Sequence, residues 1–332
     1  MMTKNLFLFI MVLLPLTASA DNVGECGENV SYSYKESTHT LTIFGTGAMK
    51  HYTKYQPAPW SNYCSDIENL VVEENVTSIG DYAFYQSGIK NVSIPNSVTY
   101  IGRYSFASTE LNSITFGNGL SEIGFSAFDK CNKLETIVIP SNVKKIGQSA
   151  FTGDLLKKVI IEDSQEELEF HVEYSSSIGF FGPIDSLYLG RNVSCYYTPF
   201  NSTTPFNLTI GGNVTRLISN VFVRKVGEHL GIKTLKIENA PTPLYCTNPF
   251  YKTPIDSIYL NREIYSETST LFGGVPSSYS LEIGNLVKEI GKEFSGSNIK
   301  KLSIPKSVEK IKTWAFQGCQ YLQYVVLISA VA

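Results

Sequence analysis

The residues that most often carry chemistry in proteins are dispersed along this chain of 332 residues. Four histidines are present, namely His39, His51, His171 and His229. None of them stands with another histidine, a cysteine or a carboxylate in a known metal-binding motif. No serine stands in the Gly-x-Ser-x-Gly pattern of a hydrolase nucleophile. The sequence therefore predicts neither an enzyme nor a metal or cofactor site.

One run of carboxylates lies near the middle of the chain. It comprises Glu162, Asp163, Glu166, Glu167 and Glu169. Calcium prefers oxygen ligands, but this run lacks the alternating Asp or Asn residues and the turn glycine of a calcium loop. We therefore favour a solvated loop over a calcium site.

Tyrosine, lysine and arginine side chains offer a different chemistry, that of a contact surface. Two segments are nearly identical, Pro-Ile-Asp-Ser-Leu-Tyr-Leu-Gly-Arg at 183–191 and Pro-Ile-Asp-Ser-Ile-Tyr-Leu-Asn-Arg at 254–262. A lysine lies between them at a related position. The candidate binding residues are Tyr188, Arg191, Lys236, Tyr259 and Arg262.

These segments belong to a repeat of about 22 residues. Its clearest copies are Ile67–Phe84, Ile89–Phe106, Leu111–Phe128 and Leu134–Phe151. Each copy has a short strand pattern, then Ile-Gly, then Ala-Phe or Ser-Phe. Repeats of this length predict a solenoid, in which each unit packs mainly against its neighbours. We expect about 12 units over residues 67–332, with the last incomplete and insertions near 162–182 and 217–231.

Each position of the repeat has a predicted structural role. Strand residues 1, 4 and 6 should point inward, and residues 3 and 5 outward. Glycine should stand where the tight coil turns. A phenylalanine ends each unit, so the rings should stack into one spine: Phe84, Phe106, Phe128, Phe151, Phe200, Phe222, Phe250, Phe272, Phe294 and Phe316. The predicted fold is mainly β, with a parallel sheet on one face and short turns or 3₁₀ segments on the other.

The strand frame places Tyr188, Thr209, Lys236 and Tyr259 at the outward fifth position of four successive strands. Such a stripe would span about 14 Å, because neighbouring strands lie about 4.7–4.9 Å apart. One interpretation is a face that binds protein or glycan. The other is a repeat subtype in which the tyrosines pack on their neighbours.

The two ends of the chain differ from the repeats. Residues 21–66 alternate as a β-hairpin would, and we expect this segment to cap the first coil, with Trp60 buried against that coil. A last strand starts at Leu322, and no polar cap follows it before Ala332. We expect that coil to fray or to pair.

Residues 1–20 have the features of a signal peptide. Lys4 precedes an apolar run, Leu6–Leu16, and Ala18-Ser19-Ala20 is a small-residue cleavage site. The protein should therefore be exported, and be secreted, periplasmic or associated with the cell surface. No later stretch is apolar and long enough to span a membrane. The net charge of −3 and the dispersed basic residues argue against nucleic acid as a partner.

Export permits disulfide bonds, and the chain has six cysteines. Cys26 and Cys64 both lie in the N-terminal segment and could form a disulfide or remain free. Cys131 and Cys319 hold the same position in distant repeats, so they cannot meet. Cys195 and Cys246 are expected to be free thiols.

The repeats resemble those of BspA-like leucine-rich repeat proteins. The residues that carry the resemblance are Val-Ser-Ile-Pro-Asn-Ser-Val-Thr-Tyr-Ile-Gly-Arg-Tyr-Ser-Phe at 92–106 and the similar segment at 302–316. The resemblance implies an exported surface protein of bacterial or, less often, protist type, in a family some of whose members adhere to host matrix proteins or to other cells. Protein or glycoprotein ligands, including host matrix, are thus the expected partners. The alternative is a structural component that self-associates through its uncapped C-terminal coil.

Overall fold

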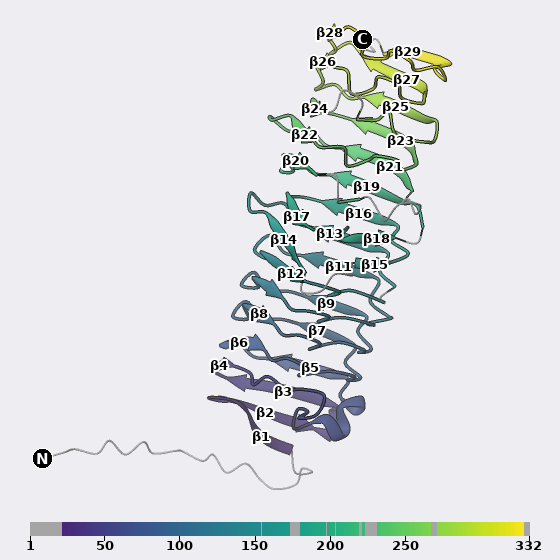
Figure 1. Cartoon of the computed structure of the whole chain (residues 1–332). Helices are drawn as coiled ribbons and strands as arrows, with labels where there is room; N and C mark the ends of the chain where they lie inside the picture. The colour runs from purple at the N-terminus through teal and green to yellow at the C-terminus, as the bar shows by residue number, and fades with distance from the viewer. Residues whose placement is uncertain are drawn as a thin grey trace, which may run out of the picture.

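The computed structural model describes residues 22–153, 155–172, 180–196, 198–202, 204–218, 221–222, 231–266 and 271–328. The predicted signal peptide and most of the second predicted insertion lie outside these residues. The described residues form an elongated β-solenoid of stacked coils (Figure 1). Two short 3₁₀ helices, η1 (Glu36–Thr38) and η2 (Ser61–Asp66), are the only helices there. The prediction of a mainly β solenoid with very little helix is confirmed.

The first strand of each coil lies on one side of the solenoid, which we call the long-strand face (Figure 1). A six-stranded sheet begins this face, with β1 (Asn22–Gly27), β2 (Val30–Lys35), β3 (Thr40–Gly45), β5 (Asn69–Val72), β7 (Asn91–Ser93) and β9 (Ser113–Thr115). A nine-stranded parallel sheet continues it, with β11 (Thr136–Ile139), β13 (Lys158–Ile161), β16 (Ser186–Leu189), β19 (Phe206–Ile210), β21 (Ile232–Ile237), β23 (Ile255–Leu260), β25 (Tyr279–Ile283), β27 (Ile299–Pro305) and β29 (Tyr324–Ile328).

The second strands form another side, the short-strand face. Seven of them pair in one sheet, β4 (Gly47–Ala48), β6 (Val76–Ile79), β8 (Tyr100–Ile101), β10 (Glu122–Ile123), β12 (Lys145–Gly147), β14 (Leu168–His171) and β17 (Val193–Cys195). Two smaller sheets follow, β20 (Arg216–Leu217), β22 (Leu244–Cys246) and β24 (Ile264–Ser266), then β26 (Glu289–Ile290) and β28 (Lys310–Ile311). Strands β15 (Phe180–Gly182) and β18 (Phe200–Ser202) pair separately.

A column of stacked aromatic rings runs through the core. All ten predicted phenylalanines belong to it, and centroids of successive rings lie 4.8 to 6.1 Å apart. Two further rings complete the column. Phe180 lies between Phe151 and Phe200, and Trp60 stacks on Phe84 at 5.8 Å. Trp60 is only 1 % exposed, as predicted, and its indole N–H donates to the Ala83 carbonyl.

The glycine after the inward isoleucine has a different role from the one predicted. A Cβ atom on Gly102 would lie 2.5 Å from the Asp81 backbone nitrogen of the preceding coil. Gly102 does not have a positive φ, whereas Tyr82 and Tyr104, two residues after each such glycine, have φ near 54° and 53°. The glycine is therefore needed because stacked coils approach closely, and the sharp turn falls on the later residue.

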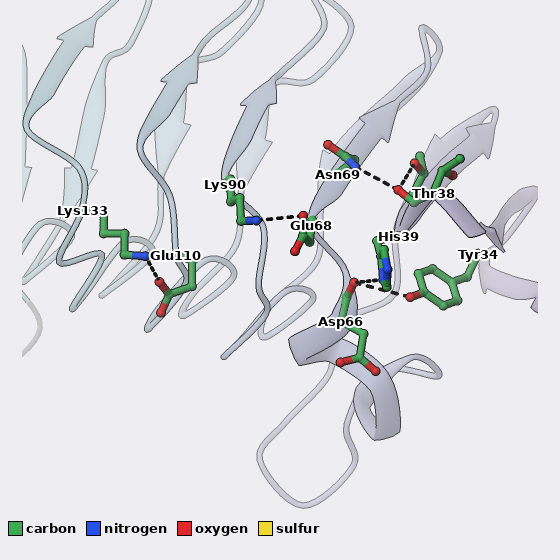
Figure 2. A network of polar contacts seen from close by, with 10 residues as sticks. Tyr34, Thr38, His39, Asp66, Glu68, Asn69, Lys90, Glu110 and Lys133 are labelled. Carbon is green, nitrogen blue, oxygen red and sulfur yellow. Dashed lines mark hydrogen bonds and ion pairs between the residues drawn. The ribbon is translucent and has the colours of Figure 1, made fainter. Parts of the chain in front are cut away.

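The N-terminal segment continues the long-strand face with antiparallel strands. Strands β1, β2 and β3 pair antiparallel, and β3 then pairs parallel with β5 of the first coil. Figure 2 shows how the hairpin is joined to that coil: Tyr34 and His39 both donate to the Asp66 carbonyl, at 3.4 and 3.0 Å. Asn69 donates in turn to the Thr38 carbonyl at 3.0 Å. These bonds satisfy the backbone at the turn before β5.

Ion pairs join successive coils at the same edge (Figure 2). Lys90 lies 2.8 Å from Glu68, and Lys133 lies 2.6 Å from Glu110. All four side chains are about half exposed. Solvent therefore screens these pairs, and each should contribute less than about 1 kcal/mol to stability.

The structure contains no Cys26–Cys64 disulfide, which corrects one alternative left open by the sequence. None of the six cysteines, all of which lie in the described ranges, is part of a disulfide. Cys26 is buried within the N-terminal segment, whereas Cys64 lies on η2 and its thiol faces the Gln86 carbonyl of the next coil at 3.6 Å. Their surroundings therefore differ, although the residues are neighbours in the domain. Burial raises the pKa of Cys26 to about 12, so this thiol stays protonated.

Candidate binding surface

The predicted stripe forms one row on the long-strand face. Tyr188 on β16 is in register with Thr209 on β19, Thr209 with Lys236 on β21, and Lys236 with Tyr259 on β23. The residues on either side of each, such as Leu187 and Leu189, are buried in the core. Strand alternation therefore turns all four stripe residues outward.

Tyr188 is tied to the first insertion. Its hydroxyl donates to the Asp163 carboxylate, with oxygen distances of 3.0 and 3.1 Å. A Cβ atom on Gly211 would lie 2.6 Å from this hydroxyl, so only glycine leaves room for the ring there. Burial and the bond to Asp163 raise the pKa of Tyr188. Tyr188 is thus half-buried and partly structural, which agrees in part with the interpretation of a packed repeat subtype.

Other carboxylates of the acidic run are also engaged by neighbouring coils. Glu162 accepts the Ser141 backbone N–H at 3.1 Å, and Glu167 pairs with Arg216 through two contacts of 2.8 and 2.9 Å. Within the described ranges, no group of three His, Cys, Asp or Glu side chains is arranged to hold a metal ion. The run connects coils rather than forming a separate loop.

Lys236 and Tyr259 present the more accessible part of the stripe. Lys236 is exposed, and its ammonium group lies 3.0 Å from the Glu238 carboxylate. Tyr259 is half-exposed and borders a shallow depression of about 240 Å³. Side chains of four strands line this depression, Thr234, Ser257, Tyr259, Ser280, Glu282, Lys301 and Ser303. The depression forms because its serine and threonine side chains are short, whereas the tyrosine, glutamate and lysine side chains beside them are long.

This depression combines an aromatic face, one carboxylate, one ammonium group and several hydroxyls. Such a set can both stack against a ligand and exchange hydrogen bonds with it. The sequence interpretation missed Glu282 and Lys301. Glu282 continues the stripe beyond Tyr259 in register, and Lys301 is in register with Ser280 on the neighbouring strand. Extending the stripe by one strand would have found Glu282, whereas Lys301 lies in the neighbouring row of outward residues, that of Ser280.

Arg191 and Arg262 do not belong to this surface, which corrects their assignment as binding residues. They are 0 % and 2 % exposed. The Arg191 guanidinium donates to three carbonyls two coils earlier, those of Pro140, Ser141 and Val143, at 2.6 to 2.8 Å. Arg262 bonds in the same way to two glycine carbonyls, at 3.1 and 3.3 Å. A buried guanidinium that is used in this way cannot reach a ligand outside.

A family model places the chain among known proteins. The BspA type leucine rich repeat region matches residues 60–178 and 200–323, in six copies. The match covers most of the chain, so the protein belongs to this family of leucine-rich repeat proteins. Membership supports a binding or adhesion role, in a family that is typically non-catalytic. No curated protein matches the chain.

The chain is also similar to several solved structures, at low sequence identity. A leucine-rich repeat protein from Eubacterium ventriosum is 18 % identical, with a TM-score of 0.45, over 93 % of this chain and 85 % of its own. A leucine rich cell surface protein from Faecalibacterium prausnitzii is 16 % identical, with a TM-score of 0.33, over 94 % and 96 %. The pneumococcal vaccine antigen PcpA is 15 % identical, with a TM-score of 0.34, over 95 % and 100 %. Across the described ranges, no helix has the length and apolar character needed to cross a membrane.

Proposed function

We propose that this protein is an exported, non-catalytic binding or adhesion module whose ligands are proteins or glycoproteins. Its contact surface is the part of the long-strand face around Lys236 and Tyr259. The observation that carries the proposal is the depression beside Tyr259, where small hydroxyl residues lie between an aromatic ring and charged side chains. The family match and the signal-peptide features of residues 1–20 support export and an adhesive role.

The chemistry of this surface favours a polar ligand that also offers an apolar face. Tyrosine supplies a rigid, amphipathic contact area at a low cost in conformational entropy. Lys236 and Lys301 can pair with acidic groups, and the serine hydroxyls can both donate and accept. Because the row continues from strand to strand, an extended ligand can contact several coils at once. Each coil then adds a small increment to the affinity.

The test begins with immobilised host matrix and mucosal glycoproteins, onto which the purified protein is passed. The triple variant Tyr188→Ala, Lys236→Ala, Tyr259→Ala should lose at least ten-fold in affinity for any ligand that the wild type binds. A matched control is Lys54→Ala with Tyr55→Ala, which removes the same chemistry from another exposed region. Circular dichroism and thermal melting establish that both variants fold. Unchanged binding by the triple variant would refute the proposed surface.

Self-association is the second candidate function, and strand β29 favours it. Residues 324–328 pair with β27 on one side, yet every side chain on the strand is exposed, from 43 % to 76 %. An apolar strand edge of this kind invites pairing with another chain. Sedimentation velocity at increasing concentration should then show a dimer, and Leu327→Lys should reduce it. A constant monomer mass would reject this candidate and leave the first unaffected.

A further inference from the structure

A second depression lies on the short-strand face, where the row of paired strands is interrupted. β24 pairs with β22 and β26 pairs with β28, but β24 and β26 belong to different sheets. The depression between them has a volume of about 270 Å³. It is lined by Glu263, Ile264, Tyr265, Ser266, Glu289, Gly291, Lys292, Glu293 and Lys312. It is separate from the surface around Tyr259.

Glu293 is the unusual residue of this depression. It precedes the spine residue Phe294, a position that alanine fills in four other coils. The equivalent alanines are Ala83, Ala127, Ala150 and Ala315. Glu293 is nevertheless only 8 % exposed. Placing a carboxylate in a buried position carries a desolvation cost. The alanines at the equivalent position of other coils fill it without this cost.

The Glu293 carboxylate explains why the strand row is interrupted. In regular coils, the glycine N–H donates to the preceding coil, from Gly124 to Ile101 at 2.8 Å. The Gly291 N–H donates instead to a Glu293 carboxylate oxygen at 2.9 Å. A Cβ atom on Gly124 would meet the backbone of the preceding coil, whereas on Gly291 it would meet Glu293 Oε2 at 2.5 Å. The carboxylate thus takes the place of a backbone carbonyl and opens a gap between coils.

The charged groups around the gap leave a negative charge uncompensated. Glu289 is paired with both Lys310 and Lys312, at 3.2 Å for Lys310. The Lys292 ammonium group lies 4.6 Å from the centre of the Trp314 ring, in cation–π contact. The Glu293 carboxylate accepts hydrogen bonds from the backbone N–H groups of Gly291 and of Glu293 itself. Its side chain lines the depression, so a ligand that enters there meets the carboxylate.

The same molecule shows which group fits between its coils. Arg191 and Arg262 each insert a guanidinium group between coils, where it donates to backbone carbonyls. A guanidinium is planar and carries several donors, so it can bond to a carboxylate and a carbonyl together. Tyr265 borders the gap with 43 % of its surface exposed and can stack on such a plane.

We propose that the depression between β24 and β26 binds the guanidinium group of an arginine on a partner protein. The Glu293 carboxylate is the anchoring group, Glu263 adds a second negative charge, and Tyr265 forms the wall. This inference does not depend on the proposed function, because it concerns another face of the solenoid and other residues.

The affinity should depend on pH. Burial raises the pKa of the Glu293 carboxyl, an effect that the Gly291 N–H and Lys312 oppose and Glu289 reinforces. The backbone N–H of Glu293 also opposes the raised pKa, but burial is the largest cause. A bound cation favours the ionised carboxylate, so binding releases a proton. Affinity should therefore rise with pH until Glu293 is fully ionised, and fall as the pH is lowered through its raised pKa.

The experiment uses the purified protein labelled with ¹⁵N-glycine, so that the Gly291 amide reports directly on the Glu293 contact. N-acetyl-arginine amide is titrated at pH 7.5, with the neutral isostere N-acetyl-citrulline amide and N-acetyl-lysine amide as comparisons. We expect a saturable millimolar shift for the arginine compound alone, since one side chain provides few contacts. Glu293→Gln keeps the shape and removes the charge. Glu293→Ala restores the residue of the regular coils, so it should fold.

Both Glu293 variants should weaken arginine binding at least five-fold, and Glu309→Ala, an exposed glutamate on the next coil, should change it less than two-fold. The triple variant of the surface around Tyr259 should bind the arginine compound like the wild type. The inference is overturned if the wild type shows no saturable shift, or if Glu293→Ala binds as well as the wild type. Equal binding of citrulline or lysine compounds would overturn the guanidinium assignment.

Discussion

In the coil that ends at Phe128, the preceding residue is Ala127, whereas in the coil that ends at Phe294 it is Glu293. Both phenylalanines are fully buried and both stack in the same column. In the regular coil the glycine N–H donates to a carbonyl of the preceding coil, whereas in the other coil it donates to the Glu293 carboxylate of the same coil. A solenoid can therefore change its surface chemistry at one coil while the core continues through it, because each coil contacts mainly its neighbours.

The long-strand face shows the same contrast. On β7 and β9, outward side chains bond to one another, with Ser113 donating to Asn91 at 2.7 Å and Thr115 to Ser93 at 3.1 Å. On β21 and β23, the outward residues include Lys236 and Tyr259, which extend beyond the small hydroxyls. Outward polar groups bond to one another on the later coils too, as Ser257 does to Thr234 at 3.2 Å, but long side chains stand beside them there. The proposed contact surface thus lies where the repeat pattern is least regular.

The largest expected effect tests whether the regular coils, represented by Phe128, and the irregular coils, represented by Phe272, share one core. Phe128→Ala and Phe272→Ala should each reduce the free energy of unfolding by about 3–5 kcal/mol, since both remove a fully buried ring. Urea denaturation measures the loss, and hydrogen exchange locates it in adjacent coils. A large loss at Phe128 and a negligible one at Phe272 would show that the irregular coils do not depend on the spine.

The next effect concerns Arg191, whose buried guanidinium joins coils in the irregular region. Arg191→Ala should cost about 2–3 kcal/mol, because it removes charge-assisted hydrogen bonds and leaves buried carbonyls unpaired. Arg216→Ala is the control, since Arg216 is about half exposed and pairs only with Glu167; its loss should stay below about 1 kcal/mol. If Arg191→Ala and Arg216→Ala lowered the melting temperature equally, the buried position of Arg191 would contribute nothing to stability.

A smaller effect, of opposite sign, is expected at Glu293. Glu293→Ala should raise the free energy of unfolding by about 1 kcal/mol at pH 8, because the buried carboxylate loses hydration. The raised pKa means that the folded state binds the proton more tightly than the unfolded state. Wild-type stability therefore falls as pH rises from the ordinary glutamate pKa through the raised one. The gain in the free energy of unfolding that Glu293→Ala brings should vanish near pH 4. Urea denaturation between pH 4 and pH 8 measures this gain, and a gain that is the same at every pH would contradict the prediction.

The smallest effect on stability is expected on the outward stripe. Lys236→Ala and Tyr259→Ala should change the free energy of unfolding by less than about 0.5 kcal/mol each, since neither side chain is buried. Ligand affinity should fall while stability is retained. Loss of stability comparable to that of Arg191→Ala would assign these residues to packing and remove the contrast between the two regions.

The amino-acid pattern predicted the strands of the long-strand face, the ten phenylalanines of the spine and the register of Tyr188, Lys236 and Tyr259. On the other face, where turns or 3₁₀ segments were expected, the structure has short paired strands. Phe180 was missed because it lies at the end of the first insertion, where the spacing of the repeat is lost. Arg191 and Arg262 were misplaced because each follows its strand, and strand alternation no longer decides which way such a residue points. Export and the cleavage site stay predictions.

The sequence alone determined the solenoid and the inward and outward positions of its strands, because a 22-residue period and strand alternation are local properties. The tertiary structure alone decided what each polar residue contacts. Asp163 reaches Tyr188, and Arg191 reaches Pro140, across 25 and 51 residues. Glu293 is another such case, since its two-residue contact with Gly291 matters only because the stacked coils separate there. Contacts between regular coils recur at 22 residues, as from Ser113 to Asn91, but these contacts depart from that spacing, so the repeat pattern does not predict them.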